Sequence, residues 1–204
     1  MIENNYRECI ERASEVVRAA PWGDLAFYAP WLAQTHYYVS HSTHLLAAAA
    51  SRMGSRHETL FRRFIAHIAE EQGHERLVAK DLEALGRVLS EFAEWPLTTA
   101  FYETQYSMIA RRSPCVLLGY ILFLEGLAAG VGPFVHEQLL GAFGPKAVSF
   151  IRVHAEDDAS HLEKAFALLD GLAADEIEEI SANVSLTCDL YCRLIRALAE
   201  AAAA

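Results

Sequence analysis

The segment from Cys115 to Val135 constrains the fold most strongly. It is apolar along its length except for one charged side chain, Glu125, near its centre. A segment this long is able to cross a membrane, but a carboxylate at the bilayer centre is costly, and the flanks offer no orientation signal beyond Arg111 and Arg112. A helix that is apolar all round also suits the centre of a soluble bundle. We therefore expect a buried core helix, no membrane association and a compensating partner for Glu125.

The rest of the chain predicts an all-α protein. Helical periodicity and good helix formers dominate, and β-branched runs bounded by hairpin turns are absent. A break is expected at Gly132–Pro133, in the middle of the apolar region. The 204 residues contain no linker, which predicts a single domain, 1–204, folded as a compact bundle of seven to eight helices. The predicted helices span about 4–20, 30–54, 55–85, 96–112, 114–132, 133–143, 145–169 and 174–204.

Charge and cysteine content limit the function classes. Asp and Glu total 27 against 17 Lys and Arg, and this formal net charge of -10 argues against a nucleic-acid partner. The first residues lack a secretory signal pattern, so we expect a cytoplasmic protein. The four cysteines form no Cys-x-x-Cys pair; they are interpreted as buried thiols in a reducing compartment, and none is placed for a zinc site. They lie at positions 9, 115, 188 and 192.

Two segments repeat one spacing of metal-binding side chains. The first reads His67, Glu71, His74, and the second reads His154, Asp158, His161. Steps of four and three residues place each trio on one face of a helix over two turns. A single Glu-x-x-His pair is common by chance on an exposed helix face. Together with the buried Glu125, however, the trios predict that three helices direct ligands into a shared interior.

Imidazoles and carboxylates are ligands for iron, manganese or zinc rather than for soft metals. Helical bundles with two metal ions place a carboxylate and a His three residues later on each of two helices, and add further carboxylates from the others. Two such units, with Glu125 able to bridge, predict a dinuclear site. Further histidines at 36, 41 and 44 are candidates for an additional ligand, although each alone is more often a core or surface residue; His57 and His136 are interpreted as surface residues.

On these residues the sequence resembles the haem-oxygenase-like, iron-containing redox enzymes, relatives of the di-iron oxidases and oxygenases of that fold. The resemblance is carried by residues 68–86, 113–133 and 149–169. It departs from some relatives at His67, where they have a Glu, and in the early core helix, which offers histidines only. These departures leave open whether the site binds one iron ion or two. The ligands that the resemblance implies are Glu71, His74, Glu125, His154, Asp158 and His161.

The resemblance implies a haem-oxygenase-like fold and a non-haem iron oxidase or oxygenase that uses dioxygen on a small organic substrate such as an amino acid, an amine or a fatty acid. Two iron ions are expected, the same ligands would accept manganese, and no catalytic residue is expected beyond the ligands. An external electron donor is expected, and a homodimer is one option. Three alternatives remain. One is an enzyme of the same fold that acts on thiamine fragments, although the nucleophilic Cys of those relatives has no clear counterpart here. A haem-binding or haem-degrading protein would use His36 or His41 but leaves the trios unexplained, and a non-catalytic helical binding protein would use the trios as polar networks.

Overall fold

Helices make up the observed structure, a computed structural model that describes the backbone of residues 2–204 and all their side chains except those of 156–161, 163 and 164. No strand occurs in this described part, so the all-α prediction is confirmed. The helices are α1 (Ile2–Ala19), α2 (Leu25–Val39), α3 (Ser42–Ala50), α4 (Glu58–Glu71), α5 (His74–Ala84), α6 (Pro96–Arg111), α7 (Leu117–Phe143), α8 (Ser149–Ala167) and α9 (Ala174–Ala202).

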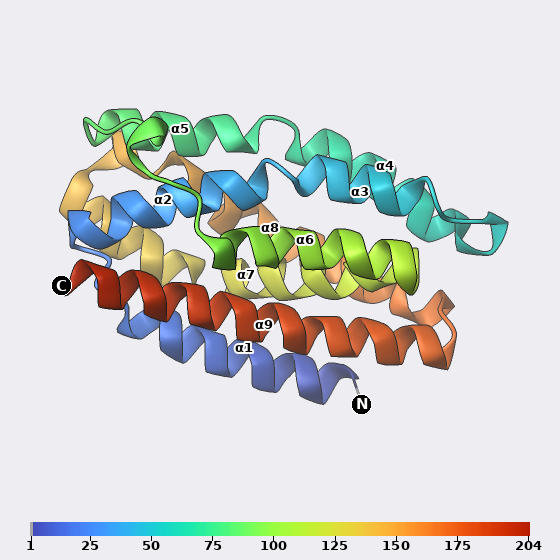
Figure 1. Cartoon of the computed structure of the whole chain (residues 1–204). Helices are drawn as coiled ribbons and strands as arrows, with labels where there is room; N and C mark the ends of the chain where they lie inside the picture. Colours follow the sequence, from blue (N-terminus) through green and yellow to red (C-terminus); the bar gives the residue numbers. More distant parts are fainter. Residues whose placement is uncertain (1) are drawn as a thin grey trace.

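Helix α7 forms the core, as its apolar sequence predicts. It packs against α8, α9 and α1, while α1 and α9 run side by side along one edge of the bundle and α4 and α5 lie along the opposite edge (Figure 1). The segment Pro114–Phe143 is long and apolar enough to cross a membrane, yet 78% of its most apolar window is buried inside the protein. The side chains of other helices therefore cover the surface that a lipid bilayer would otherwise cover.

Two predicted helices are each interrupted once. The predicted helix 30–54 is divided into α2 and α3 at Ser40, whose hydroxyl donates to the carbonyl of His36 at 2.7 Å. The predicted helix 55–85 is divided into α4 and α5 at Gln72 and Gly73. Gly73 has a φ of +94°, a left-handed conformation that glycine adopts without the steric cost of a side chain. In both cases the two halves follow one another along the same side of the bundle (Figure 1).

The predicted break at Gly132–Pro133 is wrong, because α7 continues through Pro133 to Phe143. Proline removes one helical hydrogen bond, and its ring crowds the carbonyl four residues earlier and the N–H and Cβ of the preceding residue. Here the preceding residue is a glycine, which has no Cβ, so one of these clashes is absent. A Cβ at Gly132 would also lie only 3.3 Å from the Cβ of Ala155 in α8. Glycine at this position thus serves both the continuity of α7 and its close packing on α8.

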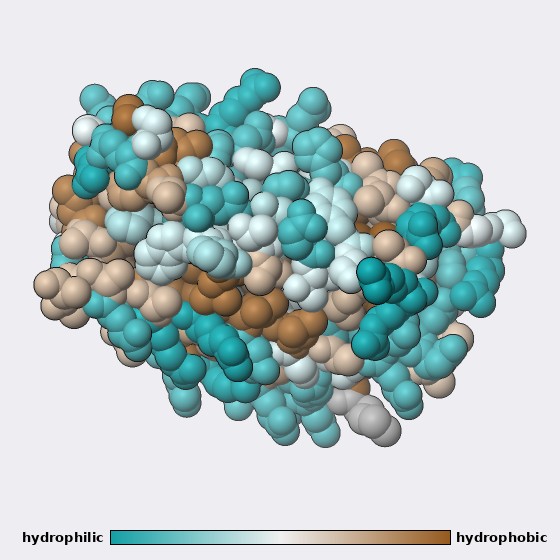
Figure 2. All heavy atoms as spheres, viewed as in Figure 1, coloured by the Kyte–Doolittle hydropathy of each residue, from teal (hydrophilic) through white to brown (hydrophobic). Residues whose placement is uncertain are grey.

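The face of the molecule drawn in Figure 2 is largely polar. Figure 2 shows hydrophilic residues over most of the visible face, with a narrow hydrophobic band across its middle near α9. Among the described residues, the large hydrophobic side chains that are exposed lie far apart in the sequence. They are Leu25, Ile65, Val88 and Leu140.

Candidate metal centre

The break between α4 and α5 places two of the predicted ligands. Glu71 is the last residue of α4 and His74 is the first residue of α5. The prediction that one continuous helix carries both is therefore wrong, but the turn at Gly73 still brings their side chains together. The Nδ1 atom of His74 lies 3.3 Å from Oε2 of Glu71.

His67 connects this pair to the core helix. Its Nε2 atom lies 3.3 Å from Oε1 of Glu71 and 3.2 Å from Oε1 of Glu125. The side chains of His67, Glu71 and Glu125 are only 6%, 13% and 8% exposed, so this contact between one imidazole and two carboxylates is shielded from solvent. The expected partner of Glu125 is thus His67, a residue that the sequence marked but did not assign as a ligand.

Helix α8 adds His154 to the same place. Its ring centroid lies 4.9 Å from that of His74, and its Nδ1 atom is 2.9 Å from the carbonyl oxygen of Phe150. A carbonyl can only accept, so Nδ1 carries the proton, and Nε2 is the ring nitrogen with a lone pair for a metal. One potential ligand atom each from Glu71, His74 and His154 lies within 4.8 Å of the others. Asp158 and His161 fall outside the described side chains.

The charge of Glu71 suits a ligand. Burial alone would raise the pKa of its carboxyl group, but hydrogen bonds from His67 and His74 hold that pKa well below its usual range. The carboxyl group is therefore ionised at neutral pH. A metal ion requires this form, because a protonated carboxylic acid binds cations poorly.

Asp81 fixes the position of α8, and it was not among the residues predicted from the sequence. This fully buried carboxylate of α5 accepts hydrogen bonds from the backbone N–H groups of Ser149 and Phe150, both at 2.9 Å, and from the Ser149 hydroxyl. It thereby caps the first turn of α8, which carries His154. The available signal was an acidic residue between two residues of an apolar helix face, Val78 and Leu82.

A cavity of about 140 Å³ adjoins the cluster. At one part of its wall lie His67, Glu71, Glu125 and His154. Tyr120 also lines it, and the Tyr120 hydroxyl is buried and has no hydrogen-bond partner among the described residues. The remaining wall is predominantly apolar and includes Trp31, Val39, Leu45, Leu46, Ile121, Leu124, Leu127 and Val131.

The histidines of the predicted second helix make other contacts. The Nδ1 atom of His36 is 3.1 Å from the carbonyl oxygen of Glu75, and His41 stacks on the ring of Tyr102 with centroids 3.7 Å apart. His44 is exposed. None of the three lines the cavity beside the described cluster. The additional imidazole at the candidate centre is instead His67.

Solved structures with the same fold are similar to the chain over nearly its whole length. A domain of unknown function with a heme oxygenase-like fold from Shewanella denitrificans has 18% identity and a TM-score of 0.85, covering 97% of this chain and 91% of that one. A TenA homolog from Pseudomonas syringae pv. tomato has 14% identity and a TM-score of 0.82, covering 98% and 91%. A TenA homologue from P. horikoshii has 12% identity and a TM-score of 0.79, covering 98% and 99%.

These likenesses confirm the haem-oxygenase-like fold and, at such low identity, carry no information on activity. A comparison with curated proteins gives no match. The comparison with protein families does give one: the family described as iron-containing redox enzymes matches residues 29–192, which include α4, α5 and α7 and most of the remaining bundle. The chain therefore belongs to the family of iron-containing redox enzymes.

Proposed function

We propose that this protein is a non-haem iron oxidase or oxygenase that uses dioxygen to oxidise a small organic substrate with an apolar chain. The observation that carries the proposal is the juxtaposition of Glu71, His74 and His154 beside a cavity with a predominantly apolar wall. Family membership supports iron and redox chemistry. The use of dioxygen, the number of ions and the substrate are the parts that we propose.

The donor set fits iron. The cluster offers carboxylate oxygens and imidazole nitrogens, which match the preference of Fe(II) and Fe(III), and it contains no sulfur among its described members. Bound iron would supply the one-electron chemistry and the dioxygen activation that these side chains alone lack. The ionised carboxylate of Glu71 would balance part of the charge of a bound cation, and the adjacent Glu125 offers a second carboxyl group for this purpose.

Each described residue has a role in this proposal. Glu71 and His74 would hold an ion at the junction of α4 and α5, and His154 would offer it Nε2, because its Nδ1–H donates to the backbone. Glu125 would help to hold a second ion, and His67, which contacts both carboxylates, would either bind metal or orient them. On the helical spacing, Asp158 and His161 would complete the second position from α8.

The cavity favours one substrate class among the three expected from the sequence. Its predominantly apolar wall would stabilise an aliphatic chain, whereas a small charged amino acid would leave its polar groups without hydrogen-bond partners there. The buried Tyr120 hydroxyl can contact the polar end of the substrate. We therefore propose a fatty acid, or a similar molecule with one polar end, as the substrate. Dioxygen and electrons from an external donor would come from the cytoplasm.

Anaerobic titration of the metal-free protein with Fe(II), followed by exposure to air, tests the proposal. We expect uptake of about two ions per chain, as in carboxylate-bridged helical bundles, and dioxygen consumption that depends on the bound iron. His154→Ala should abolish both. The matched control is His44→Ala, which removes an exposed histidine and should behave like the unmodified protein.

Three results would contradict the proposal. They are the absence of specific iron uptake, equal uptake by the two histidine variants, and iron uptake without dioxygen consumption in the presence of a reductant. Saturable haem binding with a Soret band would instead favour the haem alternative. Fatty acids, amines and amino acids should then be compared as substrates, and turnover of amino acids alone would contradict the proposed substrate class.

A further inference from the structure

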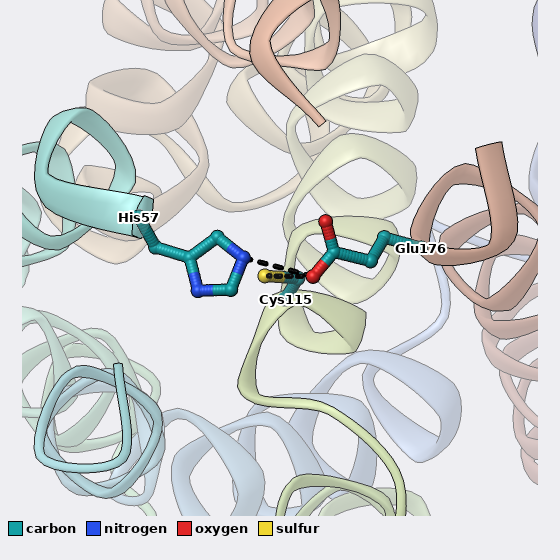
Figure 3. Close-up of side chains that lie close together, drawn as sticks. All are labelled: His57, Cys115 and Glu176. Carbon is teal, nitrogen blue, oxygen red and sulfur yellow. Dashed lines mark hydrogen bonds and ion pairs between the residues drawn. The ribbon is translucent and has the colours of Figure 1, made fainter. Parts of the chain in front are cut away.

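A second cluster of potential metal ligands lies outside the cavity. His57 comes from η1 (Ser55–His57), Cys115 from η3 (Pro114–Val116), and Glu176 from the first turn of α9. Figure 3 shows the imidazole, the thiol and the carboxylate converging from these three segments. The interpretation of His57 as a surface residue is wrong, because only 7% of it is exposed; Cys115 and Glu176 are 0% and 7% exposed.

One oxygen of Glu176 is the centre of this cluster. Its Oε1 atom lies 2.8 Å from Nε2 of His57 and 3.8 Å from Sγ of Cys115. One potential ligand atom from each residue lies within 4.8 Å of the other two. No cysteine is placed for a zinc site by its sequence spacing alone, but the fold brings Cys115 beside two other ligand-type side chains from distant parts of the chain.

The cluster is held in place before any ion binds. The second carboxylate oxygen of Glu176, Oε2, accepts a hydrogen bond from the backbone N–H of Ala173 at 3.1 Å, which fixes the plane of the carboxylate. The backbone N–H of Cys115 donates to the Ser113 hydroxyl at 3.2 Å. Such outer contacts orient ligands and reduce the ordering that a metal would otherwise impose.

The same geometry argues against a catalytic thiol. Cys115 lies beside a carboxylate that also accepts from His57, so Glu176 and not Cys115 is the residue paired with the imidazole. Burial and the neighbouring Glu176 carboxylate raise the pKa of the Cys115 thiol to about 11. A nucleophilic cysteine needs the opposite, a pKa lowered by an adjacent base or cation.

Binding of a thiophilic divalent cation would make the cluster of ion and ligands electrically neutral. A thiolate and a carboxylate together carry two negative charges, which balance a dication, and the neutral imidazole completes three ligands. With a neutral His57, binding releases the thiol proton to solvent, and the imidazole proton moves from Nε2 to Nδ1. Zinc is the common biological ion that accepts sulfur, nitrogen and oxygen together in a tetrahedral site.

A polar depression at the surface provides access. It is lined by Glu176 itself and by Arg56, whose side chain is 74% exposed and lies 3.0 Å from Oε1 of Glu176. This guanidinium can move into solvent when a cation takes its place beside the carboxylate. Arg112 also lines the depression, but the acidic residues outnumber the two arginines and make its potential favourable for an approaching cation. These acidic residues are Asp175, Glu176, Glu178 and Glu179.

We infer that His57, Cys115 and Glu176 form a second metal site, which binds Zn²⁺ with a water molecule as the fourth ligand. The site joins η1, η3 and the start of α9, so its first effect is to stabilise this end of the bundle. It is separate from the candidate iron centre, since none of its residues lines the cavity. It also differs chemically, because its ligands include a thiolate.

Cobalt titration followed by absorbance tests this inference, because Co²⁺ takes zinc positions and a thiolate ligand produces a charge-transfer band in the near ultraviolet. The unmodified protein should show this band at one equivalent. Cys115→Ser should lose it, and the matched control Cys192→Ser, which changes another buried thiol, should retain it. His154→Ala should retain it as well. Zinc should displace the cobalt. It should also raise the melting temperature of the unmodified protein but not that of Cys115→Ser.

Absence of the band from the unmodified protein, or an unchanged band in Cys115→Ser, would overturn the inference. If Cys115→Ser does not fold, His57→Gln is used instead. That variant retains the thiol, and its affinity for Co²⁺ should fall by at least about tenfold, since even altered orientation of a ligand costs 10- to 100-fold. An unchanged affinity in folded His57→Gln would equally overturn the inference.

Discussion

Helices α7 and α9 cross so closely at Gly119 that the site has no room for a side chain. A Cβ built at Gly119 would lie 2.3 Å from the carbonyl oxygen of Ile180 and 3.0 Å from the Cβ of Asn183. Real Cβ atoms essentially never come closer than 3.0 Å to another heavy atom, so the separation from the Ile180 carbonyl oxygen must grow by at least 0.7 Å, from 2.3 to 3.0 Å. That oxygen belongs to the backbone of α9, so it cannot move away by a side-chain rotation.

Gly119→Ala should therefore destabilise the protein. Overpacking of this kind costs about 1–3 kcal/mol, and the gain in helix propensity returns only about 0.5–1 kcal/mol. Because the obstructing atom is a backbone oxygen, we expect the upper half of this cost, about 2–3 kcal/mol, and so a net loss of about 1–2.5 kcal/mol. The affected contacts are the packing of α7 on α9 and the hydrogen bond from Asn183 to the Val116 carbonyl. Urea denaturation followed by circular dichroism measures the change.

Gly130→Ala is the matched control, because it makes the same substitution in the same helix. There the added Cβ would meet only Cγ2 of Ile10, at an ordinary contact distance of 3.8 Å. This variant should gain about 0.5–1 kcal/mol from helix propensity. If Gly119→Ala were as stable as the unmodified protein or as Gly130→Ala, the close crossing of α7 and α9 would be refuted.

Three further predictions concern the site and its surroundings. Leu124→Trp should fill part of the cavity, so turnover of substrates with an aliphatic chain should fall at least about tenfold while iron uptake is retained. Loss of iron, with unchanged turnover by the protein that still holds iron, would contradict this. Asp81→Ala should cost about 1–3 kcal/mol in urea denaturation and weaken iron binding, because the N–H groups that start α8 lose their acceptor; unchanged stability would show that the cap is unimportant. Burial raises the pKa of Tyr38 from 10.0 to about 12. The protonated Tyr38 therefore contributes fully to stability below pH 10, and this contribution, roughly 2–3 kcal/mol in total, is lost as the pH rises toward 12. The free energy of unfolding, measured by denaturation over this pH range, should fall more steeply for the unmodified protein than for Tyr38→Phe. Parallel falls in the two proteins would contradict the assignment.

The sequence predicted those parts of the fold that depend on local pattern. The apolar segment around Glu125 could have only a buried position in a water-soluble bundle, and a buried carboxylate needs a partner; both expectations hold in α7. The predicted helix starts at Pro96 and near Ala174 also agree with the structure. Local preference was misleading at Pro133, because the glycine before it and the packing against α8 override the usual effect of proline.

The parts that were missed depend on tertiary contacts. Gly73 could be recognised as a weak point of the predicted helix. Its left-handed conformation, which turns His74 toward Glu71, goes with the different packing partners of the two halves, since α4 packs on α3 and α5 packs on α2 and α8. The cavity is a space left between side chains of several helices, and no single segment encodes it. His57 and Cys115 lie in unrelated local sequences, so only the folded chain reveals that they share Glu176.

The most direct test of the candidate iron centre is a crystal structure of the iron-loaded protein with anomalous scattering recorded at the iron absorption edge. We predict an anomalous peak bounded by Glu71, His74 and His154, with a second peak adjacent to Glu125. The same map should show no iron at Cys115. An iron-loaded, well-ordered structure without a peak beside Glu71 and His154 would contradict the central claim that these side chains hold the metal.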